Sequence, residues 1–242
     1  MMLLRCISCE NKKMKSPVIY LVFFLIPLLP AIMGTFNYLG NIDVLTHGWY
    51  DLWTQHTLFY ADFFFAPLMA VYASYLWRIE HLNHNWNLLL TSPVDFLSIF
   101  LGKFVIMART MLLTQFWVGV LFFISGKFAG LPGAMPPVLL FWLFRGCLGG
   151  LSIIALQLFL SMMIKSFSVP IIISLFGSIA SLWMVNGGKG YFWPYALMML
   201  GMNSNSSNDK MGGFMALYLL SILLFCVIFA ALSVTCVRRR RQ

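Results

Sequence analysis

The feature that most constrains this chain is a long apolar run, residues 214–237, that stops at four consecutive arginines, residues 238–241. A helix of about 20 apolar residues is long enough to cross a hydrocarbon core of about 30 Å. Clusters of Lys and Arg next to such a helix stay on the cytoplasmic side. The run therefore predicts a membrane-spanning helix whose C-terminal end lies in the cytoplasm.

The composition of the whole chain is that of a membrane protein. Hydrophobic residues make up 61% of it and charged residues 10%, whereas soluble domains carry about 25% charged residues. The net charge of +9 would suggest nucleic-acid binding in a soluble protein. Here the positive charges gather in the arginine run and beside apolar segments, where they orient helices. We therefore expect an integral membrane protein that binds no nucleic acid.

Six apolar runs are long enough to span a membrane, which predicts an all-α, polytopic protein with a single transmembrane domain over residues 1–242. The spans cover about residues 18–38, 58–77, 104–124, 138–164, 169–185 and 214–237. An even number of spans places both termini on one side, and most Lys and Arg residues of the connections fall on that side. The other side holds only Lys127, Lys189 and Lys210. This asymmetry predicts N-in, C-in topology.

The connection between the second and third spans, residues 78–103, contains the most regular pattern outside the spans. Apolar residues recur there at helical spacing, and polar residues occupy the rest of the surface. The apolar positions are Ile79, Leu82, Trp86 and Leu89, and the polar ones include Glu80, His81, Asn83 and His84. The pattern predicts one short amphipathic helix at the cytoplasmic boundary. Ser92 and Pro93 then carry the start signal of the next helix.

The amphipathic helix has two interpretations. It could lie on the lipid surface, or it could dock a cytoplasmic partner. Helices that bind the lipid surface carry many Lys and Arg residues on their polar face, whereas this polar face is mostly uncharged. The docking interpretation is therefore favoured.

The connection before the last span is expected to have two parts. Residues 196–202 are apolar but too few to span, so we expect them to lie in the membrane interface or dip into it. Residues 203–208 are only Asn and Ser, which is typical of a flexible linker.

Sequence motifs for catalysis and nucleotide binding are absent. The chain contains no His-Glu-x-x-His, no Gly-x-Ser-x-Gly and no phosphate-binding loop. We therefore expect no enzymatic activity and no cofactor in this chain, and any ATP with Mg²⁺ must bind a partner. Cys6 and Cys9 have zinc-ligand spacing, but a structural zinc site needs two more ligands. His81 and His84 are expected to be solvated, so no metal site is predicted.

Ionisable and amide side chains within spans are candidate functional residues, because burying them in lipid is costly. Asp62 and Arg145 lie at similar depth and have opposite charge, so they could pair, hold helices together or line a transport path. Arg109 is expected to extend toward the cytoplasmic headgroups. Gln115 and Gln157 are expected to form hydrogen bonds between helices.

Several short motifs together resemble the permease subunits of bacterial ABC exporters, of the ABC-2-like type that confers lantibiotic immunity or bacitracin resistance. They are the basic segment 10–17, Pro27 and Pro30 in the first span, Trp49 and Trp53 in the outer loop, Glu80, the segment 88–94, and Lys103.

This resemblance implies a multi-pass protein of the bacterial cytoplasmic membrane. It implies a partner ABC ATPase in two copies and a second permease, either the same or a homologous chain. The expected substrate is a hydrophobic or cationic antimicrobial peptide, which is removed from the membrane in contact with lipid. Residues 79–90 would match the coupling helix that rests on the ATPase.

Two other classes of protein stay open. An ion-coupled secondary transporter would usually show inverted repeats and broken helices around a midplane site. A membrane-embedded enzyme or a non-transporting scaffold is disfavoured by the absence of a catalytic constellation.

Overall fold

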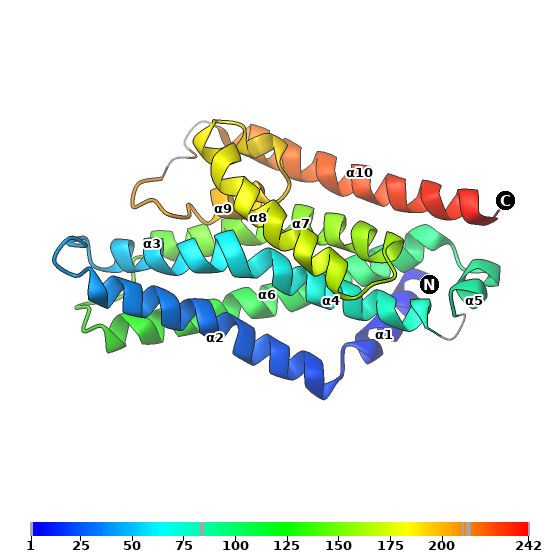
Figure 1. Ribbon diagram of the computed structural model, residues 1–242, viewed down its shortest axis with the longest axis horizontal. Helices are drawn as coiled ribbons and strands as arrows, with labels where there is room; N and C mark the ends of the chain where they lie inside the picture. The colour runs from blue at the N-terminus through cyan, green and yellow to red at the C-terminus, as the bar shows by residue number, and fades with distance from the viewer. Residues whose placement is uncertain (1, 83–84, 210, 212–213, 242) are drawn as a thin grey trace.

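Helices form all the regular secondary structure in the computed structural model, which describes residues 2–82, 85–209, 211 and 214–241 (Figure 1). The elements are α1 (Met2–Lys13), α2 (Pro17–Gly40), α3 (Trp49–Phe59), the π-helix η1 (Tyr60–Phe64), α4 (Phe65–His81), α5 (Asn85–Thr91), α6 (Phe96–Phe128), α7 (Pro137–Met163), α8 (Ser168–Asn186), the 3₁₀ helix η2 (Gly190–Phe192), α9 (Ala196–Gly201) and α10 (Met215–Arg241).

Six helices in the described part of the chain are long and apolar enough to cross a membrane, which confirms the predicted all-helical, six-span class. They are α2, the continuous stretch α3–η1–α4, α6, α7, α8 and α10. The second and third are longer than predicted, at Trp49–His81 and Phe96–Phe128. Their extra turns extend beyond the apolar runs from which the spans were predicted.

α2 starts with Ser16 as N-cap and Pro17 at the beginning of the helix, a common start signal in the sequence. The start of α6 differs from the prediction: its N-cap is Asp95, three residues after Ser92. The hydroxyl of Ser92 instead donates a hydrogen bond to the carbonyl of Leu89, at 2.8 Å. Ser92 therefore belongs to the end of α5, because its side chain satisfies a carbonyl of that helix.

Both termini lie at the same end of the bundle, together with α5 (Figure 1). We call this the terminal end, and the end that carries α3 the opposite end. The central helix is α7, which packs against α4, α6, α9 and α10. In contrast, only 17% of the most apolar part of α10 is buried inside the structure, whereas 67% of the corresponding part of α7 is buried. The peripheral position of α10 fits a helix that faces lipid on most sides.

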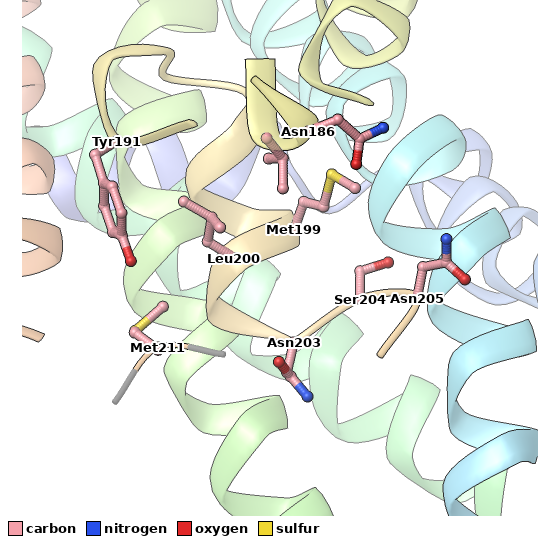
Figure 2. A pocket seen from close by; sticks show the side chains of 9 residues that line it. Asn186, Tyr191, Met199, Leu200, Asn203, Ser204, Asn205 and Met211 are labelled. Carbon is pink, nitrogen blue, oxygen red and sulfur yellow. The ribbon is translucent and has the colours of Figure 1, made fainter. Parts of the chain in front are cut away.

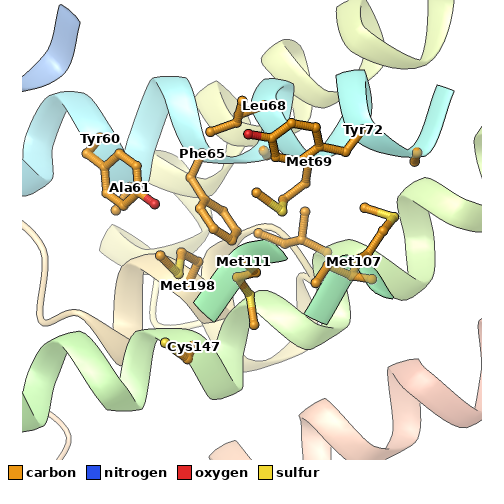
Figure 3. Close-up of a cluster of buried hydrophobic side chains, with 14 of the residues drawn as sticks. Tyr60, Ala61, Phe65, Leu68, Met69, Tyr72, Met107, Met111, Cys147 and Met198 are labelled. Atoms are coloured by element: carbon orange, nitrogen blue, oxygen red, sulfur yellow. The ribbon is translucent and has the colours of Figure 1, made fainter. Parts of the chain in front are cut away.

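The core between α4, α6 and α7 is filled by aromatic and sulfur-containing side chains (Figure 3). Phe65, Met69 and Tyr72 of α4 are fully buried and face Met107 and Met111 of α6. Methionine side chains are flexible enough to fill irregular gaps between helices. The core therefore reaches close packing without requiring one rigid side-chain shape at each position.

Glycines allow a short helix to insert beside α7. Gly146 and Gly150 lie four residues apart on α7, a spacing that permits close helix approach, and the structure adds Gly149. A Cβ atom at Gly149 would collide with the carbonyl of Leu197 in α9. Gly149 lies about 18 Å along α7 from its first residue, by helical rise. Residues 196–202 therefore reach deep beside α7 rather than resting on the bundle's rim.

Candidate functional site

The predicted single amphipathic helix over residues 79–89 is wrong. α4 continues to His81, Leu82 is extended at φ −86° and ψ 154°, and α5 begins at Asn85. The side-chain amide of Asn85 donates to the carbonyl of Ile79 at 3.0 Å. A side-chain hydrogen bond of this kind competes with continuation of a helix, because it satisfies a terminal carbonyl locally. Asn83 and His84 lie outside the described residues.

The predicted positions therefore separate into two groups. Ile79, Glu80 and His81 form the last turn of α4, whereas Trp86 and Leu89 belong to α5. His81 contacts the carbonyl of Ser161 at 3.0 Å and its ring stacks on Trp86. Neither His81 nor Trp86 presents its ring wholly to solvent.

Glu80 was expected on an exposed polar face, but it is 5% exposed and belongs to a buried ionic cluster. The cluster consists of Glu10 and Lys13 of α1, Glu80 of α4 and Lys103 of α6. The Lys103 amine lies 2.8 Å from Glu10 Oε2 and 2.6 Å from Glu80 Oε1. The Lys13 amine lies 2.7 Å from Glu10 Oε1 and 2.6 Å from Glu80 Oε1. Two cations and two anions thus compensate each other.

Lys103 is the most enclosed member of the cluster, with a side chain 0% exposed. Its amine also donates to the carbonyl of Leu76 at 3.1 Å and lies 4.5 Å from the ring centre of Trp77. Charged groups tolerate burial when they are paired and their hydrogen bonds are satisfied. The cluster therefore ties α1, α4 and α6 together at one point.

Lys13 is the more solvent-accessible cation of the cluster, with a side chain 19% exposed. Burial alone would lower the pKa of its amine, but the carboxylates of Glu10 and Glu80 raise that pKa above its usual range. The amine therefore stays charged, which keeps the cluster neutral as a whole.

A cavity of about 810 Å³ opens beside the buried ionic cluster, between α1, α5 and the start of α6. Its walls are mainly apolar and include Leu89, Val94 and Ile99, with Glu10 and Glu80 at one side. Leu88 of α5 is 68% exposed at this end of the bundle. The terminal end thus offers a short exposed helix next to an apolar cavity.

At the opposite end, the predicted pair of Asp62 and Arg145 does not form. The guanidinium of Arg145 binds the carboxylate of Asp209 at 3.0–3.1 Å and donates to the carbonyl of Gly201 at 2.7 Å. Asp62 accepts a hydrogen bond from the hydroxyl of Ser204 at 3.0 Å. Both buried groups are therefore partnered by the connection before α10, not by each other.

We call residues 196–209 the inserted segment. Residues 203–208 were predicted to be a flexible linker, but Asn203 and Ser206 are buried. The amide of Asn203 donates to the carbonyls of Ser206 and Asn208 at 3.1 and 3.0 Å, and Trp53 donates to the carbonyl of Met202 at 2.9 Å. These bonds give the polar residues a fixed structure, which a polar composition alone does not predict.

The carboxyl group of Asp209, at the end of the inserted segment, receives several hydrogen bonds. Burial alone would raise its pKa, but hydrogen bonds from Arg145, the Met211 amide and Trp142 hold that pKa below its usual range. A small pocket of about 60 Å³ lies beside the inserted segment, lined in part by Asn186, Tyr191 and Asn203 (Figure 2). It has room for a few water molecules but not for a peptide.

The remaining candidate residues have separate positions. Gln115 of α6 donates to the carbonyl of Leu143 in α7 at 3.3 Å, as expected for a bond between helices. Gln157 instead bonds the hydroxyl of Tyr195, next to the inserted segment, at 2.8 Å. Arg109 is exposed and lines a surface groove with Lys15. No described group of three or more His, Cys, Asp or Glu side chains is arranged to hold a metal ion.

Three partners were not predicted from the sequence. Lys103 was used only as one of the short motifs of the resemblance, although it lies inside a run of apolar residues, and Glu10 only as part of the basic segment 10–17. Asp209 is the only acidic residue after Asp95, so it was the only carboxylate late in the chain that could pair with Arg145. Counting the available counter-charges would have made it a candidate.

In comparison with known proteins, the family model described as ABC-2 family transporter protein matches residues 6–181. The match includes all four residues of the buried ionic cluster and ends before the inserted segment. A search of curated proteins and a search of solved structures found no match.

Proposed function

The chain belongs to the ABC-2 transporter family, and from that membership we propose that this permease subunit works with a separate ATPase to remove antimicrobial peptides from the membrane. ABC-2 membership makes the chain a multi-pass membrane protein and implies an ABC ATPase partner. The finer parts of the proposal are the peptide substrate, the bacterial cytoplasmic membrane and the site of coupling.

The observation that carries the coupling proposal is the junction between α4 and α5. α4 ends at His81, Leu82 is extended, and α5 begins at Asn85 and lies beside the cavity of about 810 Å³. Glu80, in that last turn, is bound to Lys103 and Lys13. A load on α5 would therefore pass to α4 and, through the buried ionic cluster, to α1 and α6. We propose that the ATPase binds α5 and this cavity on the cytoplasmic side.

The peptide substrate is supported by the motifs that resemble lantibiotic-immunity and bacitracin-resistance permeases. The outer loop 39–57 contains two acidic residues, Asp43 and Asp51, and no Lys or Arg. In the structure, Asp51 is buried and accepts a hydrogen bond from the backbone amide of His47 at 2.7 Å. Asp43 is exposed. A cationic peptide would therefore meet one free carboxylate on this loop rather than two.

The coupling site can be tested at Leu88, which is exposed and outside the buried ionic cluster. A charged side chain there removes apolar contact area without unfolding the bundle. We expect Leu88→Asp to abolish copurification of the co-expressed ATPase and peptide resistance, while the permease stays abundant. Val44→Asp is the matched control, because Val44 is 79% exposed in the loop at the opposite end. Normal copurification with Leu88→Asp would reject the coupling site.

The substrate is tested separately in cells that express the permease with its ATPase. We expect these cells to survive a lantibiotic or bacitracin at a dose that kills cells with the Leu88→Asp variant. Intact ATPase copurification without any gain in survival would reject the peptide substrate and leave the permease role standing.

A further inference from the structure

A second cavity at the terminal end, of about 340 Å³, lies between the ends of α4 and α7 and the connection to α8. We call it the basic pocket. Arg78 and Lys165 line it and are both exposed. None of the residues that line it is acidic, and no salt bridge to either cation is found among the described residues. The basic pocket is therefore cationic and uncompensated, unlike the neutral cluster beside the larger cavity.

Polar groups continue from the cations into the pocket. The hydroxyls of Ser74 and Ser161, both buried, lie 3.2 Å apart. The imidazole Nε2–H of His81 donates to the Ser161 carbonyl at 3.0 Å, since a carbonyl oxygen can only accept. Ser166 adds an exposed hydroxyl. Cations at the exposed side and hydroxyls at the buried side form a set that suits an anion with several oxygen atoms.

Two further features favour an anion here. The basic pocket borders the N-terminus of α8, whose N-cap residue Phe167 makes no side-chain hydrogen bond to the first turn. The first N–H groups of a helix attract anions when no side chain caps them. The guanidinium of Arg78 lies 5.7 Å from the ring centre of Phe167, which places the charge beside that terminus.

We propose that the basic pocket binds a phosphate group. The phosphate could belong to an anionic lipid headgroup or to a free phosphate ester, and Leu82 and Ile164 in the lining would contact lipid chains. Basic pockets between membrane helices on the cytoplasmic side commonly bind phospholipid headgroups. The proposal depends neither on the transported substrate nor on the coupling site. Because Leu82 also links α4 to α5, a bound phosphate would contact the same junction that we assign to coupling.

The test is native mass spectrometry of the purified permease in detergent with phosphatidylglycerol or phosphatidylcholine added. We expect wild-type protein to retain phosphatidylglycerol in preference to phosphatidylcholine. Each Lys or Arg near an anionic lipid contributes about fivefold in affinity, so Arg78→Gln with Lys165→Gln should weaken retention roughly 30-fold. The matched control is Arg238→Gln with Arg239→Gln, which removes the same charge from exposed positions at the same end but outside the pocket. The control should keep retention within about twofold of wild type.

A second variant guards against loss of fold. Ser166→Asp places a negative charge at an exposed position in the basic pocket, and it should also abolish the preference for phosphatidylglycerol. Equal retention by wild type, Arg78→Gln/Lys165→Gln and Ser166→Asp would overturn the proposal. So would a loss of retention as large in the control pair. Displacement of the lipid by millimolar inorganic phosphate would assign the pocket to free phosphate groups, whereas retention against it would assign the lipid headgroup.

Discussion

At the terminal end of the bundle four charges from three helices are buried in one cluster, whereas at the opposite end a single buried cation pairs with a partly exposed carboxylate. Glu10, Lys13, Glu80 and Lys103 compensate each other within 2.6–2.8 Å. Arg145 is 2% exposed, but the side chain of its partner Asp209 is 38% exposed. The first arrangement joins helices to helices, and the second joins a helix to a connecting segment.

The difference bears on which end can open locally. Separating α1 from α4 and α6 would leave Lys103 without Glu10 in a site closed to water, which is strongly unfavourable. Releasing the inserted segment would return Asp209 to water that it already contacts. Segments with partly solvated hydrogen bonds open at lower free energy than fully buried ones. We therefore expect the terminal end to move as a rigid unit and the polar part of the inserted segment, residues 203–209, to open on its own.

The largest expected effect is that of Lys103→Met. Removing the enclosed cation leaves Glu10 and Glu80 buried with only Lys13 between them, so the free energy of unfolding should fall by about 3–5 kcal/mol. The measurement is the folded fraction after detergent extraction, followed over temperature. Lys12→Met is the control, because Lys12 is an exposed lysine of α1, next to the cluster residue Lys13 but outside the cluster. Equal stability of the two variants would show that the buried ionic cluster does not hold this end together.

Because Glu80 belongs to the buried ionic cluster, substitution of Glu80 is not a test of ATPase docking. Replacing Glu80 by Lys would place three cations and one anion in the cluster, so the variant would report on folding. Substitutions at exposed positions on α5 test docking instead.

A smaller effect is expected at the opposite end. Arg145→Gln should lower the free energy of unfolding by about 2 kcal/mol, because the carbonyl of Gly201 and the carboxylate of Asp209 lose the hydrogen bonds that the guanidinium donates. The double variant Arg145→Gln/Asp209→Asn should cost at least about 1 kcal/mol less than the sum of the single changes. Thermal unfolding of the four proteins measures this coupling. If Arg145 couples more strongly to Asp62→Asn than to Asp209→Asn, the assigned pairing is incorrect.

The pairing of Asp209 should also make the inserted segment sensitive to acid. The pKa of its carboxyl is held below the usual range, so the stabilisation is present above the ordinary Asp pKa of about 4 and is lost as pH falls through the lower folded value. Protease protection of residues 203–209 should therefore decrease below about pH 4. Asp209→Asn should show weak protection that does not change across this range. An acid response as large in that variant would assign the titration to another group.

The smallest expected effect concerns how accessible residues 203 and 205 are to solvent. Asn203 and Asn205 both have positive φ, at 50° and 51°, so a Cys at either position carries the same backbone strain. Asn203 is buried and Asn205 exposed. In a background without native cysteines, a thiol reagent should label Asn205→Cys at least about tenfold faster than Asn203→Cys, because local opening must precede reaction at a buried site. Equal labelling rates of the two variants would support the original prediction that residues 203–208 form a flexible linker.

The spans follow from sequence because the hydrocarbon core acts on each segment separately. A run of about 20 apolar residues must form a helix that satisfies its own backbone hydrogen bonds. The number of spans and the start of α2 at Ser16 and Pro17 were therefore predictable from local sequence alone.

Predictions from the local sequence pattern were wrong where a residue's partner lies far away in the chain. Glu80 and His81 fit a polar helical face with their neighbours, but Glu80 bonds Lys103 and Lys13, and His81 bonds Ser161. α4 also ends at His81 within the helical pattern of residues 79–89, and the side-chain amide of Asn85 bonds the carbonyl of Ile79 there. Such a local hydrogen bond competes with continuation of a helix, and the hydrophobic pattern does not show it.

What the sequence determined by itself is the class of the protein: six apolar helices, charge gathered on one side, and short motifs that resemble ABC exporter permeases. What only the tertiary structure decided is which charges meet. Asp62 was the only partner for Arg145 that was predicted from the sequence, but the inserted segment, packed beside α7, brings Asp209 to it instead. The physical reason is that a buried charge requires a partner but does not specify one, and the choice depends on how the helices pack.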